Sequence, residues 1–86
     1  MQTESSQVIV RRFFEAIFEL KSRKVIRGIQ TFTTRYGINK RNFYTCKDQP
    51  GRDIFQVAWL GYLVTDYNVS PRWLLTGEGE FFAENS

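Results

Sequence analysis

The stretch from Ile29 to Lys47, IQTFTTRYGINKRNFYTCK, contains the pattern that decides the fold. Two short helical segments meet at Gly37, a residue type that tolerates the positive φ of a tight turn between helices. Apolar or small residues occupy each position that such a helix pair must bury. They are Phe32, Thr33 and Tyr36 before the glycine, and Ile38, Phe43 and Cys46 after it. This spacing predicts a helix-turn-helix over residues 28–47, with helices over 28–36 and 40–47.

The side chains that this arrangement leaves outside on the second helix are cationic or hydrogen-bonding, and none of them is acidic. They are Lys40, Arg41, Asn42, Tyr44, Thr45 and Lys47. Arginine and lysine bind guanine, asparagine binds adenine, and a threonine methyl contacts the methyl of thymine. Free N–H groups at a helix N-terminus hold phosphate. The second helix of the pair therefore carries the chemistry of a DNA-reading helix.

A long first helix is predicted over residues 6–21, with Ser5 or Ser6 as its N-cap. Apolar residues recur there at spacings of three and four, which places them on one helix face. These residues are Val10, Phe13, Phe14, Ile17 and Leu20.

Two more helices are predicted after the turn at residues 48–51. The fourth is expected to start at Asp53 as N-cap and to run to residue 67, although residues 54–57 alone also fit a short strand. Its apolar residues surround most of the helix, which predicts the buried centre of the domain. Ser70 and Pro71 start a fifth helix that ends before Gly77, and the tail with Phe81 and Phe82 is expected to fold back onto the core.

Composition limits the classes of function. A chain of 86 residues with 42% apolar residues predicts one folded domain, here residues 1–86 with a tail over 77–86. Cys46 is the only cysteine and histidine is absent, which excludes an internal disulfide, a Cys–His nucleophile and a His-containing zinc site. Without a signal-type or membrane-length apolar run, we expect a cytoplasmic protein. Residues 11–52 carry a net charge of +8 and residues 53–86 a net charge of −4, which suggests a polyanionic partner for the basic part.

The sequence resembles the lambda-repressor-like, or Cro/repressor, helix-turn-helix family. Two blocks carry the resemblance: residues 32–43, FTTRYGINKRNF, and residues 67–79, YNVSPRWLLTGEG. The order and spacing of five helices match from about Val8 to Phe82. The chain departs from the family at Thr33, where alanine is usual, and at Ile29, where glutamine is frequent. The bend over residues 49–52 is also unusual.

This resemblance implies an all-α, compact five-helix domain that binds double-stranded DNA and regulates transcription, as a repressor of the phage type. In the family, side chains at the start of the second helix of the pair reach base edges, and others hold the DNA backbone. Base contacts are expected from Lys40, Arg41, Asn42, Tyr44 and Thr45. Phosphate contacts are expected from Gln30, Arg35, Asn39 and Lys47. The resemblance also implies a homodimer, formed only on DNA or before it, with the fifth helix and the Phe81–Phe82 tail as candidate contacts.

Two alternatives use the same scaffold: a protein-interaction module and an RNA-binding adaptor. An acid-free outer face favours nucleic acid over protein. Duplex DNA is favoured over RNA, because a helix fits the major groove of DNA but not the narrow one of A-form RNA. No enzymatic activity, cofactor, metal or small-molecule ligand is expected, and a further C-terminal domain stays open.

Overall fold

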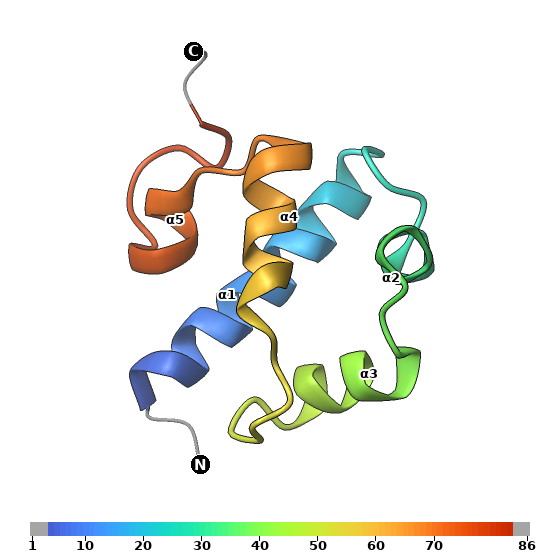
Figure 1. The fold of residues 1–86 in the computed structure, drawn as a ribbon. Helices are drawn as coiled ribbons and strands as arrows, with labels where there is room; N and C mark the ends of the chain where they lie inside the picture. Colours follow the sequence, from blue (N-terminus) through green and yellow to red (C-terminus); the bar gives the residue numbers. More distant parts are fainter. Residues whose placement is uncertain (1–3, 84–86) are drawn as a thin grey trace. The chain divides into compact units, whose positions relative to one another are not determined.

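The computed structural model describes residues 4–83 and contains five α-helices and no strand within that range. They are α1 (Glu4–Ser22), α2 (Ile29–Tyr36), α3 (Lys40–Asp48), α4 (Val57–Tyr67) and α5 (Pro71–Thr76), as drawn in Figure 1. The all-α class is thereby confirmed. The chain forms two compact units, Met1–Phe55 and Gln56–Ser86, which are described separately below. The single domain expected from chain length stays a prediction.

In the first unit, α1 buries the predicted apolar face. Its five apolar residues and Ala16 are at most 4% exposed. Ser5 and Ser6 lie inside α1, so the prediction that one of them caps it is wrong. The helix ends at Ser22, and Lys24, with φ of 63°, turns the chain so that the N–H of Val25 bonds back to the Leu20 carbonyl at 2.9 Å.

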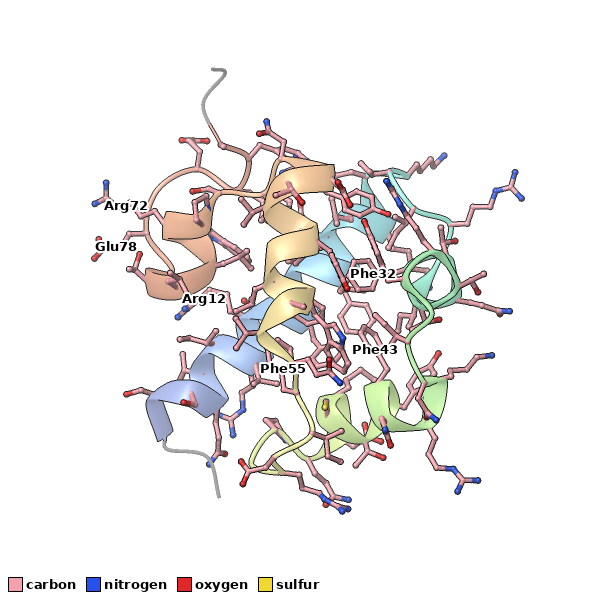
Figure 2. All side chains as sticks on the ribbon, in the orientation of Figure 1. Arg12, Phe32, Phe43, Phe55, Arg72 and Glu78 are labelled. Atoms are coloured by element: carbon pink, nitrogen blue, oxygen red, sulfur yellow. The ribbon has the colours of Figure 1, made fainter. Side chains whose placement is uncertain are left out.

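An aromatic cluster centred on Phe13 fills the interior of this unit. The ring of Phe13 meets those of Phe32 and Phe43 edge to face, each at 5.9 Å between centroids, and that of Phe55 at 5.1 Å. Figure 2 labels Phe32 and Phe43, which are fully buried, and Phe55, which is half-buried. Edge-to-face ring pairs stabilise the fold by more than the burial of their apolar area alone. The cluster therefore fixes α2 and α3 against α1.

The predicted start of α4 is wrong. The helix begins at Val57 with Gln56 as the N-cap residue, and Asp53 lies in a turn. Residues 54–57 do not form the alternative strand either. Both differences have one physical cause: the ring of Phe55 packs against Phe13, which holds residues 53–55 in the first unit, and a continuous helix from residue 53 would move that ring away.

In the second unit, the prediction that α4 is the buried centre is wrong, because only one face of this helix is buried. Trp59 and Leu63, four positions apart on one helix face, are its buried residues, whereas Val57 is 77% exposed. Although apolar residues surround most of α4, only the face with Trp59 and Leu63 packs against the rest of the chain. Asn68 follows the helix in the left-handed conformation, with φ of 59°, so the helix ends at residue 67 as predicted.

The predicted start of α5 is confirmed, because the Ser70 hydroxyl accepts the Trp73 N–H at 3.2 Å and Pro71 is the first helical residue. The tail folds back within this unit. The Phe81 ring meets Trp73 at 4.9 Å, and Phe82 forms an antiparallel bridge with Val69. Both phenylalanines are half-buried by these contacts, which makes them less suited to an intermolecular contact than the sequence suggested.

Candidate nucleic-acid interface

The turn between α2 and α3 has the geometry that the sequence predicts. Gly37 adopts φ 64° and ψ 34°, and the N–H of Ile38 bonds to the Thr33 carbonyl at 2.9 Å. The side-chain oxygen of Asn39 then accepts the Asn42 N–H at 2.9 Å and caps α3. A left-handed glycine followed within two residues by a side-chain cap ends one helix and starts the next. Figure 1 shows the short connection.

Four of the six positions that the sequence predicts to be inside the helix pair are buried, whereas Tyr36 and Ile38 are only half-buried. Phe32, Thr33, Phe43 and Cys46 are at most 3% exposed. Thr33 takes the place of the small residue, and its hydroxyl donates to the Gln30 carbonyl at 3.2 Å, so the extra polar group is satisfied inside the helix. Burial raises the pKa of the Cys46 thiol, partly opposed by the charge of Arg52. The thiol is therefore a neutral core group.

The five residues proposed for base contacts share α3 but differ in exposure. Lys40, Arg41 and Asn42 are exposed on its first turn, and Tyr44 is 39% exposed one turn on from Lys40 and Arg41. Thr45 is half-buried, so it has less surface to offer than its neighbours. The first turn contains no acidic residue. Its polar side chains and the positive end of the helix therefore favour an anionic ligand at the same place.

The residues proposed for phosphate contacts are distributed over both helices. Gln30 and Arg35 are exposed on α2, and the Arg35 guanidinium lies 5.2 Å from the Tyr36 ring centroid. Asn39 uses its side-chain oxygen for the cap, which leaves its amide nitrogen as the donor to offer. Lys47 is half-buried, with its ammonium 3.5 Å from Asp48 Oδ1 and 5.9 Å from the Phe18 ring centroid. Those contacts make Lys47 the weakest of the four candidates.

An open hollow of about 610 Å³ lies along the exposed side of α2. Gln30 and Arg35 line it together with four residues that were not among the predicted contacts: Arg27, Gly28, Thr31 and Thr34. Positions 30, 31, 34 and 35 follow helical spacing within α2, so a search for a polar stripe opposite Phe32 would have found Thr31 and Thr34, whereas Arg27 precedes the helix. The hollow adds a second guanidinium and two hydroxyls to the phosphate-binding candidates.

Comparison with known protein families, curated proteins and solved structures gives no match to this chain. Within residues 4–83, none of the helices combines the length and apolar character that crossing a bilayer requires. The same part of the chain holds no cluster of three or more acidic or cysteine side chains that could bind a metal ion.

Proposed function

We propose that the chain is a sequence-specific DNA-binding regulator of transcription, a repressor with a lambda-repressor-like fold that blocks a promoter by occupying an operator. The observation that carries this proposal is the helix pair itself. A left-handed Gly37 and the Asn39 cap present the first turn of α3 with Lys40, Arg41 and Asn42 exposed. Exposed basic and amide side chains on the first turn of such a helix are suited to base edges in the major groove.

In this proposal, α3 is the recognition helix and α2 holds the DNA backbone. Arg41 and its neighbours contact bases, while Gln30 and Arg35 at the open hollow along α2 contact phosphates. The phosphate contacts set position and orientation but carry no sequence information, so the two groups of residues have separable effects. The activity is binding and not catalysis, and the location is the cytoplasm.

One short helix reads only a few base pairs. Two copies are therefore needed to recognise a site that is long enough to be specific. We place two copies on a two-fold symmetric operator with half-sites about one helical turn, roughly 34–36 Å, apart. The absence of acidic residues in the first turn of α3 favours nucleic acid over a protein partner. The fit of a helix to the major groove of DNA favours duplex DNA over A-form RNA.

Selection of bound sequences from a random duplex pool tests the proposal. The expected result is an enriched motif with two inverted elements, lost when Arg41 and Lys40 are both changed to alanine. The matched control replaces Arg11 and Lys21, two exposed cations of α1, and keeps the motif. A pool that yields no enriched sequence contradicts sequence-specific binding.

A further inference from the structure

Tyr44 is an aromatic residue of α3 to which the fold gives no specific partner. Within residues 4–83, its ring contacts no other ring and no cation, and its hydroxyl forms no hydrogen bond, whereas Tyr36, Tyr62 and Tyr67 each have such an interaction. The side chain is 39% exposed on the middle turn of the helix. A tyrosine between packed and open surface offers an apolar ring and a polar tip to a ligand. Tyr44 is therefore available for a contact outside the chain.

Tyr44 lies on the same side of α3 as two cations of the first turn. It follows Lys40 by four positions and Arg41 by three, and all three residues are exposed. Residues at these spacings are neighbours on a helix, with about 5–6 Å between their Cβ atoms. Successive nucleotides of one DNA strand are about 3.4 Å apart along the axis. With α3 in the major groove, the side chains of Arg41 and Tyr44 therefore reach adjacent base pairs.

The chemistry of Tyr44 differs from that of its neighbours on this surface. Lys40 and Arg41 carry only hydrogen-bond donors, which suit the O6 and N7 acceptors of guanine. The other apolar residues of α3, Phe43 and Cys46, are buried, so Tyr44 is the exposed apolar side chain of this helix. The apolar group that a base presents in the major groove is the 5-methyl group of thymine. The ring of Tyr44 is therefore suited to a methyl group beside a guanine.

Thr45 is the other residue of α3 with the chemistry for this contact, since a threonine methyl also packs against the methyl of thymine. Its side chain is half-buried, whereas that of Tyr44 is exposed. The difference in exposure assigns the contact to Tyr44. Cytosine methylated at C5 carries the same group at the same place in the major groove, so two bases supply the chemistry that Tyr44 recognises.

We infer that Tyr44 reads the 5-methyl group of a pyrimidine next to the guanine that Arg41 contacts. The inference rests on the proposed function, because it requires that α3 lies in the major groove of duplex DNA. Each half-site of the operator then contains a 5-methylpyrimidine, either thymine or 5-methylcytosine, beside a guanine. Burial of one methyl group changes a binding constant about fourfold. This factor is the preference that we expect for the methylated over the unmethylated pyrimidine in each half-site.

Replacement of single thymines by deoxyuridine in the selected site tests the inference with the full chain. Uracil lacks only the 5-methyl group and pairs with adenine in the same way as thymine. One replacement per half-site, next to the guanine at which Arg41→Ala relaxes the preference, should weaken binding about fourfold. If the selected base there is cytosine, its methylation at C5 should instead strengthen binding about fourfold, which identifies 5-methylcytosine as the source.

Three variants assign the preference to a side chain. Tyr44→Ala removes the ring and should bind the methylated and unmethylated sites equally, whereas Tyr44→Phe keeps the ring and should keep the preference. Thr45→Ser removes the other methyl group on α3 and should leave the preference unchanged. Thermal melting shows that each variant is folded. A merely structural role of Tyr44 would weaken binding to all sites by the same factor, and the ratio between the two sites would not change.

A preference that persists in Tyr44→Ala, or that disappears in Thr45→Ser, overturns the inference. Equal binding of the wild-type chain to the site with and without each methyl group overturns it as well. If Tyr44→Phe weakens all sequences equally, the hydroxyl holds phosphate and the ring reads no base. Failure of the proposed function looks different, because the chain then binds no duplex at low salt. A chain that binds its selected site without any methyl preference keeps the function and loses the inference.

Discussion

Arg41 and Arg35 are two exposed arginines of the same motif, placed on different helices. Arg41 lies on the first turn of α3, and Arg35 lines the open hollow along α2. A guanidinium on a recognition helix reads a base pair, whereas one on the preceding helix holds phosphate. The two residues should therefore fail in different ways when they are removed.

We expect Arg41→Ala to weaken the best site by about 1–3 kcal/mol and to relax preference at one base pair. Arg35→Ala should weaken all sequences similarly and lower the salt slope by about one. Binding to a set of single-base variants of the selected site measures both effects, with Arg11→Ala as the control. If Arg35→Ala changes the preferred base while Arg41→Ala acts uniformly, the roles are reversed.

Cys46 predicts a pH dependence of stability. Burial raises the pKa of its thiol above the ordinary value of 9.0, so the folded state binds a proton more tightly than the unfolded state. The stabilisation is complete below that ordinary value and is lost as the pH rises through the folded pKa. In urea unfolding between pH 7 and about pH 10.5, the free energy of unfolding of wild type should fall toward that of Cys46→Ala. A gap between the two proteins that stays constant over this range would show that the thiol has the same pKa in the folded and unfolded states.

At the scale of elements, the helix ends depend on single side chains. The Asn39 side-chain oxygen accepts the Asn42 N–H at 2.9 Å and caps α3, which fixes the turn between α2 and α3. Asn39→Ala should lower the free energy of unfolding by about 1 kcal/mol, and Asn39→Ser should retain most of it. Urea unfolding of the three proteins at one pH checks this. Equal losses in both variants would mean that the amide contributes by a contact other than the cap.

The elements that the sequence predicts well are those whose signals are local. Gly37, Asn39, Asn68 and Ser70 each fix a helix end through a bond within a few residues, and the structure has all four ends where they were expected. The outer face of α3 follows from the buried face by helical spacing alone. Most of the candidate site was therefore accessible to sequence reasoning.

The elements that the sequence predicts poorly depend on contacts between residues that are distant along the chain. Asp53 has the chemistry of an N-cap, but the packing of Phe55 on Phe13, 42 positions away, moves the start of α4 to Val57. Periodicity could not show which apolar side of α4 is buried either, because apolar residues surround most of that helix. Exposure of Val57 and the contact of Lys47 with Phe18 likewise depend on tertiary placement.

At the scale of the whole molecule, charge is divided along the sequence. Residues 11–52, which include the helix-turn-helix, carry eleven of the twelve basic residues and three acidic ones. Residues 53–86 carry five of the nine acidic residues and one arginine. A polyanion should therefore bind to the basic part and not to the chain as a whole.

This division predicts a salt dependence that distinguishes the possible partners. If about five phosphates are neutralised per copy, log K for duplex DNA should fall against log[salt] with a slope of about −4 to −5. Fluorescence anisotropy of a labelled random duplex at several salt concentrations measures the slope, and a duplex RNA of the same length is the control. The RNA should bind more weakly, because its narrow major groove excludes α3. Tighter binding to RNA would favour an adaptor for RNA, and absence of binding to either duplex at low salt would favour a protein-interaction module. A slope near zero together with tight binding would contradict the electrostatic argument itself, since counterion release follows from phosphate contacts of any sequence.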